Sequence, residues 1–224
     1  MDSMFSFIIE VIGTIAFAIS GIRMAAAKRF DWFGAYVVGL VTAIGGGTLR
    51  DVLLDAPVFW MQTWWYLAVT GLSLVFVIIF RKALVKHLRA LLLFDTVGLA
   101  LFVVIGIQKS LAFNYPIWVA IAMGMITGAF GGVLRDILIN EEPRFFREDV
   151  YATACLAGGG VYWLTLVCGG AEIFQQILCA ATVILLRWCA IKYSWQLPTL
   201  KHGDFRVQKH PGSGWTYPQT GDVS

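Results

Sequence analysis

The amino-acid sequence repeats itself at a fixed spacing of 85 residues, and the repeated unit is hydrophobic. Segment 46–51 reads Gly-Gly-Thr-Leu-Arg-Asp, and segment 131–136 reads Gly-Gly-Val-Leu-Arg-Asp. The same spacing joins Phe17 to Phe102, and no gap is needed along the register. An internal duplication in a hydrophobic chain is the ground plan of many proteins that carry solutes through a bilayer.

Composition places the chain in a membrane. It is 58% hydrophobic and only 14% charged, whereas soluble domains carry about 25% charged residues. Residues 59–80 and 111–134 contain no charged side chain, and about 20 apolar residues suffice for a helix to cross the hydrocarbon core. The sequence predicts an all-α transmembrane fold of seven helices, near residues 4–22, 32–49, 59–80, 91–107, 116–134, 151–167 and 173–188.

The basic residues orient these helices. If the seven spans are threaded in order, 15 of the 17 lysines and arginines fall on one side of the membrane, and only Arg50 and Lys109 fall on the other. Basic residues accumulate on the cytoplasmic side. We therefore expect an integral protein of a bacterial-type cytoplasmic membrane, with its N-terminus outside and its C-terminus in the cytoplasm.

Three spans per repeat is an odd number, so the second copy must enter the membrane upside down. The expected organisation is a first three-helix repeat over 1–88 and an inverted repeat over 89–168. A seventh helix over 169–197 and a flexible cytoplasmic tail over 198–224 complete the chain, because glycine and proline replace aliphatic residues beyond 198.

Glycines gather in the second and fifth spans. A glycine costs a helix interior up to about 1 kcal/mol relative to alanine, so a cluster favours a kink or an unwound turn. Broken helices at matching positions of two repeats point to a transport site, and the freed carbonyls are ligands for a dehydrated cation. The alternative is that the glycines only allow close helix packing. The candidate ion pathway comprises Thr42, Gly45, Gly46, Gly47, Thr127, Gly128, Gly131 and Gly132.

A charged pair follows each glycine cluster. Arg50-Asp51 and Arg135-Asp136 are expected at opposite faces of the membrane, and a charge at such depth generally faces protein or water. Each pair is either a gate, in which arginine sets an electrostatic barrier, or a salt bridge that anchors the end of its helix. The two interpretations are compatible.

Two acidic residues also match at the 85-residue spacing. Glu10 and Asp95 are candidate cation attractors at the two pore mouths, or else acids placed favourably near a helix N-terminus. The hydroxyls of Thr42 and Thr127 either line the pathway or bond to carbonyls of their own helices. The sequence contains no nucleophile–base pair, phosphate loop or HExxH metal motif, so we expect neither an enzyme nor a cofactor nor a metal site.

The doubled Gly-Gly-x-Leu-Arg-Asp motif on two three-helix repeats resembles the prokaryotic branch of the trimeric intracellular cation (TRIC) channel family, also known as a family of glycine-transporter domains. The resemblance covers residues 8–197. It implies a homotrimer in which each subunit has its own pore for potassium and other monovalent cations, lined by the kinked second and fifth helices. Membrane lipid is the other expected partner, and nucleic acid is not expected.

The leading hypothesis is a potassium-permeable channel whose pore lies between the inverted repeats, with potassium or sodium as the permeant ion. On this hypothesis, leucine at Gly46 or Gly131 abolishes flux and leaves assembly intact. The alternative is a secondary transporter of a small zwitterion such as glycine, because half-helix ends can bind both a carboxylate and an ammonium group.

Overall fold

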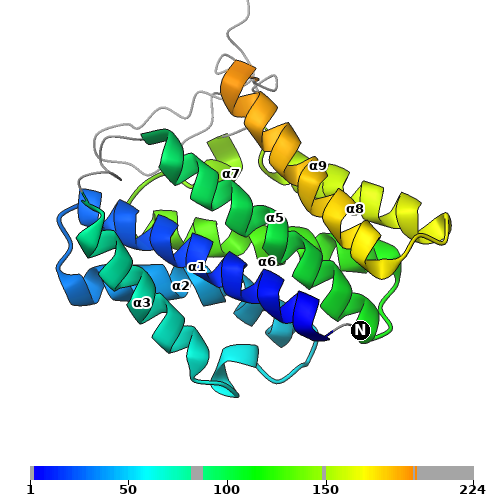
Figure 1. The fold of residues 1–224 in the computed structure, drawn as a ribbon, viewed down its shortest axis with the longest axis horizontal. Coiled ribbons are helices and arrows are strands. Elements are labelled where there is room, and N and C mark those ends of the chain that lie inside the picture. The colour runs from blue at the N-terminus through cyan, green and yellow to red at the C-terminus, as the bar shows by residue number, and fades with distance from the viewer. Residues whose placement is uncertain (1–2, 82–87, 148–149, 194, 196–224) are drawn as a thin grey trace, which may run out of the picture.

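The computed structural model describes residues 3–81, 88–147, 150–193 and 195, and these residues form helices without any strand. Figure 1 shows them as one bundle in which α1 and α5 run side by side through the centre. The elements are α1 (Ser3–Ala27), α2 (Trp32–Leu53), the short 3₁₀ helix η1 (Phe59–Met61), α3 (Trp65–Ile79), α5 (Leu88–Ala112), α6 (Ile117–Leu138), α7 (Arg144–Arg147), α8 (Ala152–Val167) and α9 (Glu172–Tyr193).

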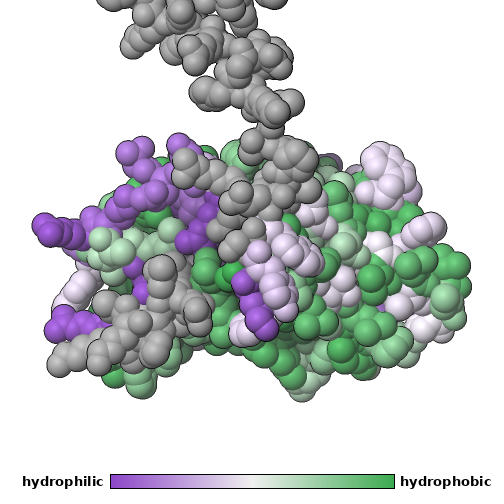
Figure 2. Space-filling model, turned by 90° about the horizontal axis from the view of Figure 1, so that it is seen from above, coloured by the Kyte–Doolittle hydropathy of each residue, from purple (hydrophilic) through white to green (hydrophobic). Residues whose placement is uncertain are grey.

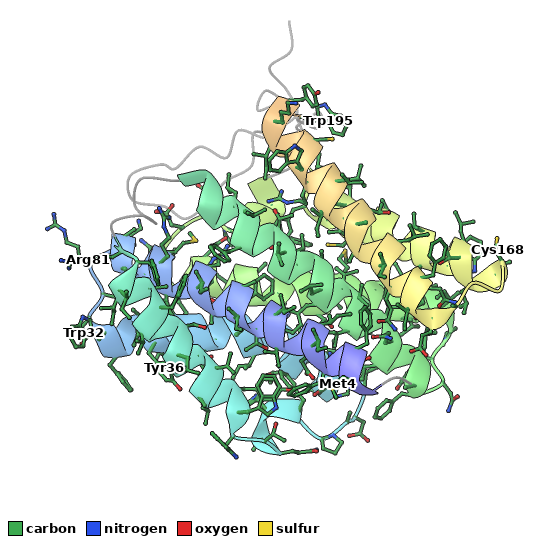
Figure 3. The ribbon with its side chains drawn as sticks, viewed as in Figure 1. Met4, Trp32, Tyr36, Arg81, Cys168 and Trp195 are labelled. Carbon is green, nitrogen blue, oxygen red and sulfur yellow. The ribbon has the colours of Figure 1, made fainter. Side chains whose placement is uncertain are left out.

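The helices are those of an integral membrane protein. Helices α1, α2, α5, α6 and α9 are long and apolar enough to cross a bilayer, and α3 and α8 are shorter apolar helices. Hydrophilic residues gather at one end of the molecule, where α1 and α3 finish, and much of the remaining surface in Figure 2 is hydrophobic. Arg81 lies at that end and Cys168 at the opposite end (Figure 3). The predicted tail over 198–224 lies outside the described residues.

Equivalent helices of the two repeats pack against each other in antiparallel fashion. In the pair α1–α5, Gly13 lies against Phe102, and Gly98 lies against Phe17. The rings of Phe17 and Phe102 stack with centroids 5.2 Å apart, so one pair of equivalent residues meets at the centre of the bundle. The repeats are therefore inverted relative to one another along the helix axes.

The turns that follow equivalent helices of the two repeats also match. Among the residues that the structure describes, four non-glycine residues have positive φ, and they form two pairs that are 85 residues apart: Arg29 (63°) with Asn114 (61°), and Asp55 (52°) with Asn140 (55°). Left-handed backbone is uncommon for residues other than glycine. Its recurrence at equivalent positions shows that both repeats leave their first and second helices through the same turns.

The predicted kinks at the glycines are not confirmed. Helices α2 and α6 run as continuous α-helix through both glycine clusters. A Cβ atom at Gly46 would collide with the carbonyl oxygen of Thr127, and a Cβ atom at Gly131 would collide with the carbonyl oxygen of Thr42. The glycines thus bring the backbones of α2 and α6 together, and this close packing offsets their low helix propensity.

Candidate functional site

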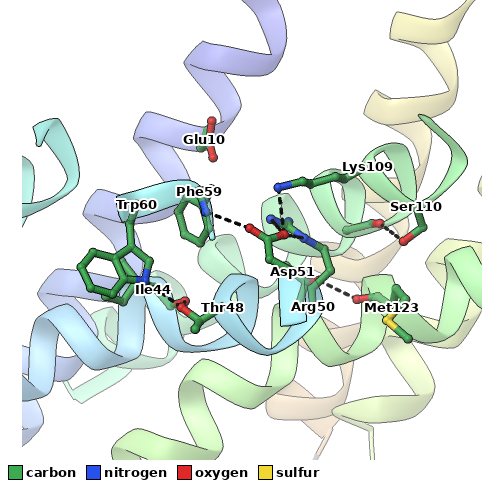
Figure 4. Close-up of polar contacts among 12 residues, drawn as sticks. Glu10, Ile44, Thr48, Arg50, Asp51, Phe59, Trp60, Lys109, Ser110 and Met123 are labelled. Atoms are coloured by element: carbon green, nitrogen blue, oxygen red, sulfur yellow. Dashed lines mark hydrogen bonds and ion pairs between the residues drawn. The ribbon is translucent and has the colours of Figure 1, made fainter. Parts of the chain in front are cut away.

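The end of α2 carries a buried ionic group that we call the Asp51 cluster: Arg50, Asp51, Phe59 and Lys109. The Asp51 side chain is fully buried. Its Oδ1 accepts a hydrogen bond of 2.8 Å from Arg50 Nε and lies 2.8 Å from Lys109 Nζ. Its Oδ2 accepts a hydrogen bond of 2.9 Å from the backbone N–H of Phe59 (Figure 4). Lys109 comes from α5, so this ion pair ties the two repeats together.

An open cavity adjoins the Asp51 cluster. It has a volume of about 620 Å³, and Lys109, Glu10 and Tyr66 are among its lining residues. The Tyr66 hydroxyl donates a hydrogen bond of 2.6 Å to Glu10 Oε1. Because Glu10 is only partly buried, its carboxylate is accessible to ions that enter this cavity.

The end of α6 carries the equivalent group, which we call the Asp136 cluster: Ser20, Asp95, Arg135 and Asp136. Arg135 is fully buried. Its Nε donates a hydrogen bond of 2.8 Å to Asp136 Oδ1, and its Nη1 bonds to Ser20 Oγ at 2.9 Å and to Asp95 Oδ1. The second Asp136 oxygen accepts from the backbone N–H of Arg144, as Asp51 accepts from Phe59, 85 residues earlier.

The two clusters differ where the repeats differ in sequence. The position equivalent to Lys109 is Met24, whose sulfur accepts a hydrogen bond of 3.6 Å from Arg144 Nη2. The Asp136 cluster instead receives a cation from α9. Arg187 is buried, its guanidinium lies 4.6 Å from the centroid of the Tyr151 ring, and it interacts electrostatically with Asp95. In each cluster, therefore, a buried aspartate interacts with a cation from outside its own repeat: Asp51 with Lys109, and Asp95 with Arg187.

The predicted pathway residues lie between the clusters, where α2 crosses α6. The hydroxyls of Thr42 and Thr127 donate to the carbonyls of Val38 and Met123 in their own helices, each at 2.6 Å, which matches the second of the two predicted roles. An added Cβ atom would meet neighbouring atoms within 3.1 Å at each of the predicted glycines, which are Gly45, Gly46, Gly47, Gly128, Gly131 and Gly132. The glycines are packed in this conformation.

The predicted pore-mouth acids lie in different surroundings. Glu10 lines the open cavity, as a residue at a mouth would. Asp95 is fully buried and paired with Arg135, so it does not lie at an open mouth in this conformation. Asp95 is one methylene shorter than Glu10, and it bonds to the arginine where Glu10 bonds to a tyrosine.

The sequence analysis assigned no site role to Lys109, Arg187, Tyr66 or Tyr151, whose side chains lie in or beside these clusters. Two signals were available. Tyr66 and Tyr151 recur at the 85-residue spacing, and Lys109 is one of only two basic residues expected on its side of the membrane. Arg187 gave no such signal, because α9 has no counterpart in the repeat.

Comparison with known proteins agrees with this geometry. A sequence model of a family described as "Glycine transporter" matches residues 7–82 and 92–166, which are the two repeats. The chain is 38% identical over 194 residues to the UPF0126 inner membrane protein YadS of Escherichia coli strain K12, covering 85% of this chain and 94% of that protein.

Solved structures show the same fold. The TRIC trimeric intracellular cation channel orthologue from Rhodobacter sphaeroides superposes with a TM-score of 0.82 and 32% identity, over 86% of this chain and all of that one. A prokaryotic TRIC channel crystallised in 0.5 M KCl gives a TM-score of 0.80 and 30% identity, over 87% and 99% of the two chains. The duplicated helices, the paired ionic clusters and these similarities lead to one conclusion: the chain belongs to the prokaryotic TRIC family, whose sequence model is described as a glycine transporter.

Proposed function

We propose that the protein is a passive channel for monovalent cations, with potassium or sodium as the permeant ion and a pore within each subunit between the inverted repeats. Seven spans, an outside N-terminus and a homotrimeric assembly belong to the same proposal. The observation that carries it is the pair of matching buried ionic clusters, one at each end of the α2–α6 crossing. The similarity to solved cation channels of the TRIC family supports it.

The cation route starts at the open cavity beside the Asp51 cluster. Glu10 offers a partly exposed carboxylate there, and a carboxylate raises the local concentration of cations. From this cavity the route passes the Asp51 cluster, the α2–α6 crossing and the Asp136 cluster. The described conformation is closed, because the glycines are packed and Arg135 is sealed from solvent.

Opening requires α2 and α6 to separate at the glycines. Once they separate, the carbonyl oxygens of Thr42 and Thr127 no longer face glycine Cα atoms and become available to a permeating ion. Kinks in α2 and α6 then belong to the open state. The arginines of the two clusters act as gates, since a fixed positive charge opposes a cation until it is drawn aside.

A carrier of a small zwitterion such as glycine is the second candidate, and the family description as a glycine transporter favours it. One preparation separates the two functions. Purified protein in liposomes is tested for voltage-driven potassium current and for uptake of radiolabelled glycine. We expect unitary current steps and no saturable glycine counterflow; counterflow without current steps would overturn the channel assignment.

Lys109 provides a test of the gate. Methionine at this position reproduces the equivalent Met24 of the other repeat and removes the ion pair with Asp51. A charge-assisted contact that exists only in the closed state contributes about 1.5 kcal/mol or more, so its loss raises the open fraction about ten-fold. We expect Lys109→Met to increase the initial potassium efflux from liposomes by that factor.

Lys28→Met is the matched control. Lys28 also joins the two repeats, through an ion pair with Glu141, but both side chains are more than 40% exposed. Such surface pairs contribute about 0–1 kcal/mol, so potassium efflux should stay close to that of the wild type. Equal efflux from the two variants would show that Lys109 has no gating role.

A further inference from the structure

A groove lies between the first part of α5 and the last part of α9. Its volume is about 360 Å³, within the range of ligand-binding pockets. Leu92, Leu93 and Thr96 line it from α5, and Ile184, Trp188, Ile191 and Lys192 line it from α9. The lining is therefore mostly aliphatic and aromatic, with one hydroxyl and one ammonium group.

The two polar groups occupy different parts of the groove. Thr96 is 3% exposed, and its Oγ1 has no hydrogen-bond partner among the residues that the structure describes. Lys192 is exposed, and its Nζ lies 5.4 Å from the centroid of the Tyr193 ring near the end of α9. A buried hydroxyl without a partner indicates that an acceptor belongs beside it, because burying it unbonded costs about 1–3 kcal/mol.

The groove lies on a surface of the protein that would face membrane lipid. Among the residues that the structure describes, α9 is one of five helices long and apolar enough to cross a bilayer, and Trp188 and Leu93 are 59% and 46% exposed. Tryptophan and lysine together near a helix end are typical of the membrane–water interface. At this depth, the molecules that offer both an alkyl chain and an anionic group are phospholipids.

We propose that this groove binds an anionic phospholipid, with an acyl chain between α5 and α9 and the phosphate beside Lys192. Charge complementarity selects the headgroup, since each lysine near the surface favours anionic lipid by about 1 kcal/mol. The acyl chain covers the aliphatic wall, and an ester carbonyl is the acceptor that the Thr96 hydroxyl needs. The proposal does not depend on the transport activity.

The groove is the outer wall of the Asp136 cluster. Thr96 follows Asp95 along α5, and Trp188 follows Arg187 along α9, so alternate residues of the same two helices face the lipid and the cluster. A bound lipid holds α9 against α5 and keeps Arg187 over the Tyr151 ring. Lipid binding should therefore raise the thermal stability of the folded protein.

The test is lipid retention by the purified full-length protein in detergent, measured by native mass spectrometry with dioleoylphosphatidylglycerol and dioleoylphosphatidylcholine. Lys192→Gln should weaken phosphatidylglycerol binding about five-fold and abolish the preference over phosphatidylcholine. Leu93→Trp, which fills the groove from its exposed rim, should abolish retention of both lipids and the stabilisation that phosphatidylglycerol gives. Arg81→Gln is the matched control, because it removes an exposed cation that does not line the groove.

Several results would overturn the proposal. One is wild-type retention of phosphatidylglycerol by both Lys192→Gln and Leu93→Trp. Another is equal retention of the two lipids by the wild type. Retention that appears only after residues 196–224 are removed would show that the chain's own terminus occupies the groove. Loss of the oligomer in Leu93→Trp, with no lipid retained by the wild type, would show that a second copy covers it.

Discussion

Alanine at Gly46 or Gly131 should prevent α2 and α6 from packing and leave little folded protein. In each case the added methyl group would overlap a backbone carbonyl of the opposite helix, and backbone cannot rotate away as a side chain can. Overpacking of a close-packed interior costs about 1–3 kcal/mol or more. The measurement is the midpoint of thermal unfolding in detergent, together with the yield of the monodisperse species.

Gly160→Ala is the control for this prediction. Gly160 lies inside α8, and a Cβ atom built on it meets nothing within 4 Å. Alanine favours a helix interior over glycine by up to about 1 kcal/mol, so this variant should match or exceed the wild-type midpoint. If Gly46→Ala unfolds at the same temperature as Gly160→Ala, the α2–α6 contact is not what holds the repeats together. From the sequence alone, leucine at Gly46 or Gly131 was expected to leave assembly intact. From the structure we expect that even alanine at either position prevents folding.

Removal of the Arg135 charge should be more damaging than removal of the Arg50 charge, although the two residues are equivalent in the repeat. Arg135→Gln leaves Asp95 and Asp136 buried without the guanidinium that bonds to both. Breaking a buried pair in this way costs about 3–5 kcal/mol. Arg50→Gln leaves Asp51 with Lys109 Nζ and the Phe59 N–H, so its loss should be clearly smaller.

The two variants are compared by their unfolding midpoints under the same conditions. A second substitution adds a direct check: Asp95→Asn should restore part of the stability of Arg135→Gln, because it removes one of the two buried carboxylates that lose the Arg135 guanidinium. Equal destabilisation by Arg135→Gln and Arg50→Gln would contradict the role assigned to Lys109. Absence of any rescue would contradict the pairing of Asp95 with Arg135.

Much of the fold could be predicted because the duplication is visible residue by residue. The 85-residue spacing aligned Phe17 with Phe102, and the odd number of spans per repeat predicted that the two copies are inverted. The structure stacks these two equivalent rings at its centre. Hydropathy located the long apolar helices, since length and the absence of charge decide whether a segment can cross a bilayer.

The conformation at the glycines could not be predicted in this way. Helix propensity measures what a glycine costs within its own helix, and it contains nothing about a partner helix. The close approach of Gly46 to Thr127 depends on a residue 81 positions away. The same limit explains why Lys109 and Arg187 were missed, because each interacts with an acid on another helix and has no equivalent cation in the other half.

The contacts between α1 and α5 and between α2 and α6 join equivalent surfaces, as in an isologous dimer. A single three-helix unit could form this interface with a second copy only if the two copies were inserted in opposite directions. Two identical copies would also be obliged to carry the same residue at positions 24 and 109. Joining both units in one polypeptide removes that obligation, and it allows methionine at one end of the molecule and lysine at the other. The covalent fusion of the two units is thus what allows the two ends of the molecule to differ in charge and in chemical response.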